Sequence, residues 1–170
     1  AETTNSFQRY LGPDVKAKHV YTDNSKEFQC SLADQAFSHD TCTPYTPATN
    51  GVAERAVRRV KEGTSACLVQ SGLADRWWHK AMQCFSFIRN VVGLRDDGVT
   101  AYEKRYGEKF NGPIIAFGTG LRYKPSRPKD KEKLPKLGDE TLRGVFVGYV
   151  QHAVGGWTGD VDIIDALDLT

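Results

Sequence analysis

Apolar residues recur at helical spacing through the middle of the chain. From Val52 onward they fall on one face of a long helix, which Asn50 would cap by accepting a backbone N–H bond. A second long helix is expected over residues 75–92. The positions expected to be buried are Ala53, Ala56, Val57, Val60, Cys67 and Leu68 in the first helix, and Trp78, Ala81, Phe85 and Ile88 in the second.

Shorter elements are marked by brief apolar or β-branched runs between Gly and Pro residues. Beyond Gly112 such runs follow closely on one another, which predicts a small antiparallel barrel with an exposed Lys/Pro-rich loop over residues 125–136. The expected strands cover residues 18–22, 40–43, 114–117, 120–123, 144–149 and 161–164, and the expected short helices end at 11 or cover 31–37 and 101–106.

The composition is that of a folded domain. The 170 residues are 39% hydrophobic and 26% charged, which excludes an intrinsically disordered chain. The net charge of +2 does not by itself indicate a nucleic-acid partner, but the charge is clustered. Residues 122–143 hold eight basic and four acidic residues, and residues 159–170 hold four Asp and no base. Such a basic cluster forms either a phosphate-binding surface or, more commonly, a solvated face.

The cysteines and the absence of targeting segments indicate the cellular compartment that we expect for the protein. The four cysteines lack the paired spacing of a zinc site, which favours free thiols in a reducing compartment. No signal peptide and no apolar run of about twenty residues is present, so we expect a nuclear or cytoplasmic protein that is neither secreted nor in a membrane. The first residue is Ala1 instead of Met, which suits a piece of a longer protein.

Two carboxylates stand where a metal site would need them. Asp23 ends the predicted strand at 18–22, and Glu54 lies in the first turn of the long helix, where the helix dipole favours its ionised form. Mg²⁺ prefers such oxygen ligands. Arg58 and Lys61 follow on the Glu54 face of the helix. Taken singly, each residue has a purely structural explanation as a turn residue, a helix-dipole partner or a solvated charge.

The strings around these residues resemble the copia-type branch of the retroviral-like integrases of LTR retrotransposons. Asp23-Asn24 with Glu27-Phe28 resembles the DN-x-x-EF signature of that family's second carboxylate. The string from Pro44 to Arg55 resembles its PYTP-x-x-NGVAER signature around the third. The string from Thr100 to Gly107 resembles the segment after the catalytic core, and Phe146 to Tyr149 resembles a strand of the SH3-like module that follows.

The resemblance implies a fold, a site and partners. The fold would be α/β, a truncated RNase H-like integrase core over residues 1–95, a connecting helix over 96–112 and an SH3-like antiparallel β-module over 113–170. The parent would bind Mg²⁺ or Mn²⁺, join element DNA ends to target DNA, and act as a homo-oligomer. The implied catalytic and metal-binding residues are Asp23 and Glu54, and the implied DNA-binding residues are Asn50, Arg55, Arg58, Arg59 and Lys61.

Two departures from the family pattern leave alternatives open. The 30 residues between Asp23 and Glu54 are fewer than the family's usual spacing, and only 22 residues precede Asp23, too few to carry the first catalytic Asp. We therefore expect this chain alone to be inactive in strand transfer. The alternatives are a non-catalytic nucleic-acid-binding remnant of a decayed element, or an RNase H-like enzyme that cuts RNA–DNA hybrids.

Overall fold

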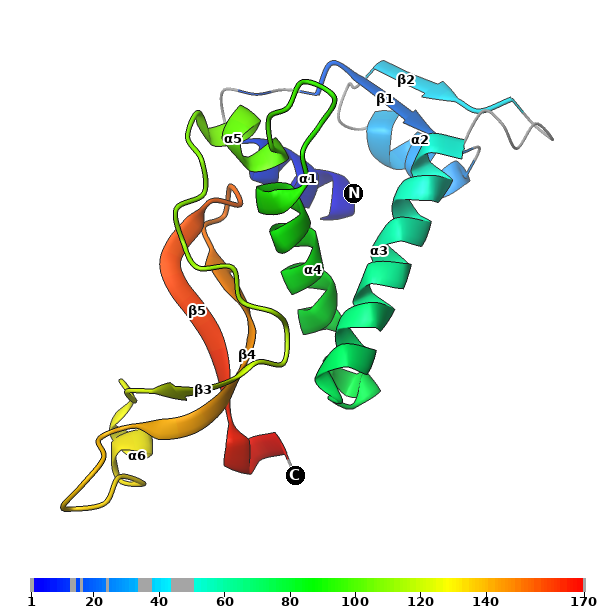
Figure 1. The fold of residues 1–170 in the computed structure, drawn as a ribbon. Helices are drawn as coiled ribbons and strands as arrows, with labels where there is room; N and C mark the ends of the chain where they lie inside the picture. Colours follow the sequence, from blue (N-terminus) through cyan, green and yellow to red (C-terminus); the bar gives the residue numbers. More distant parts are fainter. Residues whose placement is uncertain are drawn as a thin grey trace. The chain divides into compact units, whose positions relative to one another are not determined.

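The computed structural model describes residues 2–12, 15, 17–23, 25–33, 38–43 and 51–169 (Figure 1). It combines helices with two small sheets, one of two strands and one of three. The chain divides into two compact units, Ala1–Arg59 with Gln151–Gly156, and Val60–Val150 with Trp157–Thr170. The predicted division at residues 95 and 112 stays a prediction.

The first unit is built around a short parallel strand pair. Its strands are aligned residue for residue, from His19 opposite Ser38 to Thr22 opposite Thr41. The helix between the two strands makes this a β–α–β unit. The hydroxyl of Ser31 in that helix lies 2.8 Å from the hydroxyl of Thr4 in the helix that precedes the first strand. In chain order its elements are α1 (Glu2–Leu11), β1 (His19–Thr22), α2 (Lys26–Ala33) and β2 (Ser38–Thr41).

Two predicted boundaries in this unit are wrong. Helix α2 begins at Lys26 instead of residue 31, because Ser25 caps it: the Ser25 hydroxyl accepts from the Phe28 N–H at 3.4 Å. Strand β2 begins two residues before the predicted strand at 40–43. Its polar side chains pair across the strands, with His39 Nε2 2.7 Å from the Thr22 hydroxyl. The predicted helix end at Leu11 and the strand at β1 are confirmed.

The second unit contains the second long helix, the C-terminal part of the first and nearly all of the three-stranded sheet. Helix α3 (Gly51–Ser71) runs across the division between the units. The predicted second long helix is confirmed as a 3-10 turn followed by α4, and the predicted helix at 101–106 is confirmed as α5. The sheet order is β3–β4–β5. The elements are η2 (Asp75–Trp77), α4 (Trp78–Val92), α5 (Ala101–Tyr106), β3 (Gly120–Tyr123), α6 (Pro128–Lys131), β4 (Leu142–Gln151), β5 (Trp157–Asp165) and η3 (Ala166–Leu169).

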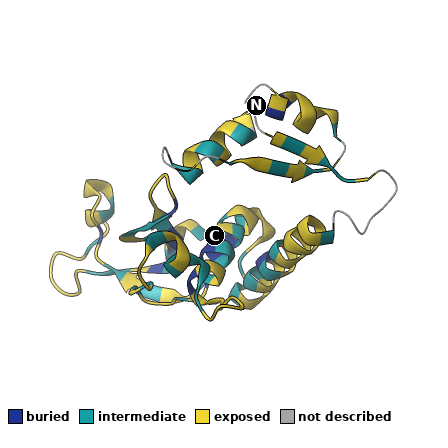
Figure 2. Cartoon of the chain, turned by 90° about the horizontal axis from the view of Figure 1, so that it is seen from above, coloured by how far each residue is buried: buried dark blue, intermediate teal, exposed yellow. Residues whose placement is uncertain are grey.

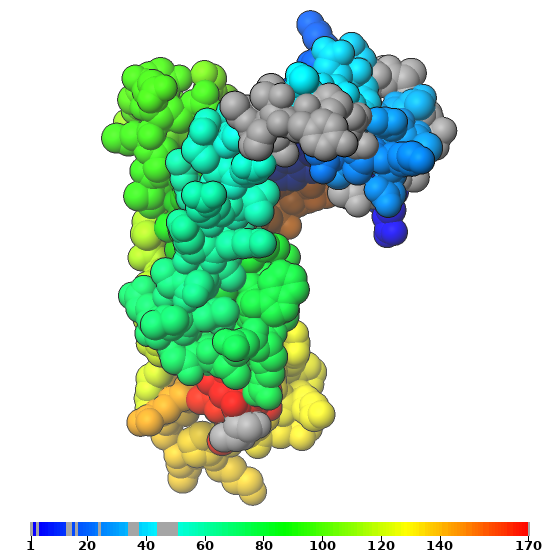
Figure 3. Space-filling view, turned by 90° about the vertical axis from the view of Figure 1, so that its right-hand side faces the viewer, coloured from blue at the N-terminus to red at the C-terminus, as the bar shows by residue number. Residues whose placement is uncertain are grey.

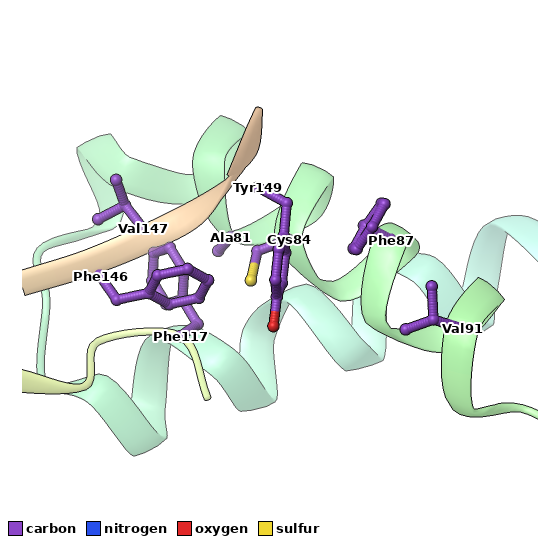
Figure 4. Packing of buried hydrophobic residues seen from close by; sticks show 8 residues of the cluster. All are labelled: Ala81, Cys84, Phe87, Val91, Phe117, Phe146, Val147 and Tyr149. Carbon is purple, nitrogen blue, oxygen red and sulfur yellow. The ribbon is translucent and has the colours of Figure 1, made fainter. Parts of the chain in front are cut away.

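Helix α4 and strand β4 share one hydrophobic core (Figure 4). The ring of Phe87 stacks on that of Tyr149 with centroids 4.5 Å apart, and Phe146 meets Tyr149 edge-on at 5.1 Å. Helix α3 packs closely against α4 at Gly63, where a Cβ atom would overlap the ring of Phe85. The buried residues of the core are Ala81, Cys84, Phe87, Val91, Phe117, Phe146, Val147 and Tyr149. Burial raises the pKa of the Cys84 thiol to about 12, so this thiol stays protonated.

The buried stripe of α4 differs from the predicted one. Ala81 is buried as expected, but Trp78 is 55% exposed, and Trp77 packs against the core in its place. Phe85 and Ile88 are only partly buried. The predicted strand at 114–117 is also wrong, because this segment is irregular and its Ile115 N–H donates to a side chain. The Tyr149 hydroxyl accepts from the Ile115 N–H and donates to the Pro113 carbonyl, both at 2.8 Å.

We expect Tyr149→Phe to lower the free energy of unfolding by about 1–3 kcal/mol, because it leaves the Ile115 N–H and the Pro113 carbonyl without their partner. Burial raises the pKa of the Tyr149 phenol, so the hydroxyl remains protonated and able to donate. Urea denaturation measures the change. Tyr102→Phe, in the same aromatic cluster, is the control, and an equal loss there would contradict this role for the hydroxyl.

Candidate metal site and nucleic-acid interface

Asp23 lies at the carboxyl end of β1, as predicted. The parallel ladder ends there, where the Cys42 N–H donates to the Thr22 carbonyl at 2.9 Å. The Asp23 side chain is exposed, and its Oδ1 accepts from the Ser25 N–H at 3.3 Å. Asp23 therefore has the local setting that its predicted role requires.

Glu54 lies in the first turn of α3 and is exposed. Asn50, which is both the predicted cap of this helix and part of the predicted active-site loop, falls outside the described residues. Among the described residues, no group of three or more His, Cys, Asp or Glu side chains is arranged to hold a metal ion. Metal binding by Asp23 and Glu54 stays a prediction.

The N-terminal part of α3 presents a cationic surface. All four predicted DNA-binding cations of this helix are exposed, and exposed residues extend over most of its length (Figure 2). In the space-filling view the helix faces the viewer from its cyan to its green end (Figure 3). Arg58 and Lys61 follow Glu54 by one and two turns, on the same side of the helix. The four cations are Arg55, Arg58, Arg59 and Lys61.

The structure adds a second cationic position that the sequence analysis did not single out. Arg122 of β3 lies directly opposite Arg143 of β4, so both side chains leave the same face of the sheet, and both are exposed. They flank a shallow hollow of about 490 Å³ with Gly120 and Gly144. Like charges in this position repel each other, and Arg122 is partly neutralised by an ion pair with Asp139. Arg143 lies one residue before the strand predicted at 144–149, which is why this pairing was not foreseen.

The Lys/Pro-rich loop is less free to bind phosphate than its composition predicts. It contains the short helix α6, and the Lys133 ammonium lies 2.7 Å from Asp165 Oδ2 and 3.5 Å from Asp130 Oδ1. Asp165 is buried, with 9% of its surface exposed. The hydrogen bond from Lys133 and a second one from the Leu167 N–H lower the pKa of Asp165. The pair ties the loop to the end of β5.

We expect Asp165→Asn to lower stability at pH 7, and the difference from wild type to shrink in acid. The folded-state pKa of Asp165 lies below the unfolded value of about 3.9. Its carboxylate therefore stabilises the fold above about pH 4, and this contribution is lost as the pH falls through the folded-state pKa. Urea midpoints at pH 7 and in acid measure both effects. Asp96→Asn, at an exposed position, is the control, and a gap that widens in acid would contradict the assignment.

The chain is similar to retrovirus-related Pol polyproteins from plant transposons. It is 27% identical over 145 residues to that of transposon TNT 1-94 from Nicotiana tabacum, which covers 82% of this chain. It is also 27% identical over 154 residues to that of transposon RE2 from Arabidopsis thaliana, which covers 85% of this chain. These matches cover 11% and 10% of the two relatives, so the chain spans about a tenth of their length. No protein-family model matches the chain.

A solved structure has a partly similar fold. It is a chain in the cryoEM structure of the simian T-cell lymphotropic virus intasome in complex with PP2A regulatory subunit B56 gamma. The TM-score is 0.48 and the sequence identity 17%, and the match covers 96% of this chain and 60% of that one.

Among the residues that our structure describes, no helix has both the length and the apolar composition needed to cross a bilayer.

Proposed function

We propose that this chain is the integrase segment of a copia-type retrotransposon polyprotein, comprising the C-terminal part of an RNase H-like core and the SH3-like module after it. The observation that carries the proposal is the similarity to the plant Pol polyproteins over more than four fifths of the chain. The strings around Asp23 and Glu54 resemble the signatures of an integrase, which favours this segment of the polyprotein over the other Pol enzymes. The β1–α2–β2 unit, with Asp23 at the end of its first strand, supports the same assignment.

Asp23 and Glu54 are the residues that would hold the metal. Both are exposed carboxylates at the end of a structural element, and hard oxygen donors of this kind suit Mg²⁺ or Mn²⁺. When bound, the metal would neutralise charge on a phosphate and activate the attacking oxygen of water or a DNA 3′-hydroxyl. The chain contributes two of the three carboxylates of the family's site, so it would require a third from elsewhere in the parent.

DNA would be bound by charge, without reading of base sequence. The exposed cations of α3 lie on the helix that carries Glu54, so the phosphates they bind would lie near the metal. Arg122 and Arg143 provide a second anion-binding position on the sheet. An anion between these two guanidinium groups would relieve their mutual repulsion. None of these residues is part of a base-reading motif.

We expect the purified chain to show no strand transfer with Mg²⁺ or Mn²⁺, because one of the three carboxylates is missing. The assay is the joining of labelled DNA ends to a target duplex. Joining by this chain that disappears in Glu54→Gln would overturn the prediction. The matched positive test is the same chain extended upstream through its natural reading frame. There we expect metal-dependent joining that both Asp23→Asn and Glu54→Gln abolish, and retained activity in both variants would overturn the proposed function.

A second candidate is a non-catalytic nucleic-acid-binding remnant. The shortened stretch between Asp23 and Glu54 favours it. The upstream reading frame decides between the two candidates: a strand that ends in Asp at the family's spacing supports the enzyme, and an early stop codon supports the remnant.

A further inference from the structure

Strand β5 has an open edge beside a groove. Within the described residues β5 is hydrogen-bonded to β4 alone, so its other edge has no neighbouring strand. Strand β5 also lines a groove of about 690 Å³. Seven consecutive residues, 159–165, line it, which means that the groove follows the strand for roughly 23 Å. Trp77 and the segment of residues 123–130 supply further lining residues.

We propose that this groove binds an extended peptide segment of a partner protein, in which basic and apolar residues alternate, as an additional strand on β5. A strand edge carries backbone N–H and C=O groups that water or another strand must satisfy. An added peptide strand uses those groups for affinity, and its alternating side chains determine specificity. The proposal is independent of the metal site and of DNA binding by α3.

The charge of β5 selects a basic segment. Asp160 and Asp162 are two residues apart and so point to the same side of the strand, and Asp168 follows in the turn after it. Asp160 and Asp168 are exposed. A Lys or Arg at every second position of an added strand would lie opposite Asp160 and Asp162, although the Asp162 carboxylate is already paired with the Lys80 ammonium at 2.7 Å. Of the two cations that line the groove, Lys124 and Arg127, the first is paired with Glu140 at 2.8 Å.

The intervening positions select apolar residues. Val161 and Ile163 alternate with the two Asp residues and are partly buried. Trp77 and Tyr123 add aromatic surface to the groove, against which the aliphatic part of a Lys or Arg side chain can pack. The preferred segment is therefore a strand of the form basic–apolar–basic–apolar.

The same charges disfavour the other occupants of an open strand edge. A second copy of β5 would bring two Asp-rich strands together, and like charges opposite each other destabilise a strand pair. Nucleic acid would meet Asp160, Asp162 and Asp168 with its phosphates. A basic peptide is the occupant that the charges of the groove attract.

The test is fluorescence anisotropy with the whole chain and a labelled peptide in which Lys alternates with Val, at physiological salt. The first control peptide has the same composition with Lys and Val in separate blocks. We expect the alternating peptide to bind about tenfold more tightly, because only it presents its charges on one side of a strand. Equal affinities would overturn strand addition, and so would the absence of binding.

A pair of variants with the same change in net charge locates the site. Asp160→Lys with Asp168→Lys should weaken binding by about tenfold or more, because it places like charges opposite the peptide. Asp96→Lys with Glu108→Lys, at exposed positions that do not line the groove, should change it by less than about twofold. Equal losses of peptide affinity in the two variants would show non-specific attraction. A dimer of the unmodified chain that the Asp160→Lys/Asp168→Lys variant disrupts would show that a second copy occupies the groove. Either result would overturn the proposal.

Discussion

Phe146→Ala should lower the free energy of unfolding by about 3–5 kcal/mol, which is a large part of the 5–15 kcal/mol typical of a domain. Phe146 is fully buried between α4 and the irregular segment before β3. Its backbone is held at 2.9 Å by hydrogen bonds to both Gly118 and Thr119. The surrounding chain therefore cannot close around the missing ring, and a cavity should remain beside Tyr149.

The measurement is urea denaturation followed by circular dichroism, with Leu137→Ala as the control. Leu137 is also apolar, but 93% of its surface is exposed, so its truncation should change stability by less than about 0.5 kcal/mol. Similar losses of stability in the two variants would contradict the burial of Phe146 in a core shared by α4 and β4.

Most of the helices could be predicted from the sequence, whereas their buried faces could not. Helical spacing identifies α4, but it does not choose between the neighbouring residues Trp77 and Trp78. The stripe that packs on the core passes through Trp77, Ala81, Cys84 and Val91, which leaves Trp78 outside. On α3, Ala53, Ala56 and Val57 continue the pattern of the partly buried residues Val60, Cys67 and Leu68 but are exposed. Spacing alone does not show how far a packing partner extends.

The strands show a second limit of local pattern. Residues 114–117 have the composition of a strand, but the Ile115 N–H donates to the Tyr149 hydroxyl, more than thirty residues away, instead of to a neighbouring strand. Conversely, β2 has the sequence Ser-His-Asp-Thr, which has little apolar pattern, and is a strand because β1 pairs with it. Both outcomes depend on contacts between distant residues.

The candidate site was predicted in part. Asp23 at a strand end and Glu54 in a helix's first turn could be placed from turn and helix signals, and the structure places each in that local setting. The Asn50 loop falls outside the described residues. The Arg122–Arg143 pair could not be found without the strand register, because 20 residues lie between the two positions in the sequence. The ion pair that engages Lys133 depends in the same way on a distant partner, Asp165.

DNA binding by this chain should be strongly salt-dependent, and α3 should carry a large share of that dependence. If each of the four exposed cations of α3 neutralises one phosphate, affinity for duplex DNA should fall about 150-fold between 50 mM and 200 mM salt. Arg58→Ala with Lys61→Ala removes two of these contacts and should flatten the slope of log affinity against log salt by up to about two units. Affinity should depend little on DNA sequence, because phosphate contacts carry no sequence information.

The measurement that tests the proposed DNA-binding role of α3 most directly is this salt titration, made by fluorescence anisotropy on a labelled duplex. It compares the unmodified chain, the Arg58→Ala/Lys61→Ala variant, and an Arg89→Ala/Lys109→Ala control that removes the same charge from exposed positions outside α3. We predict a flatter slope for the α3 variant and an almost unchanged slope for the control. Equal slopes for all three proteins would contradict the account, because the helix that carries Glu54 would then not face DNA.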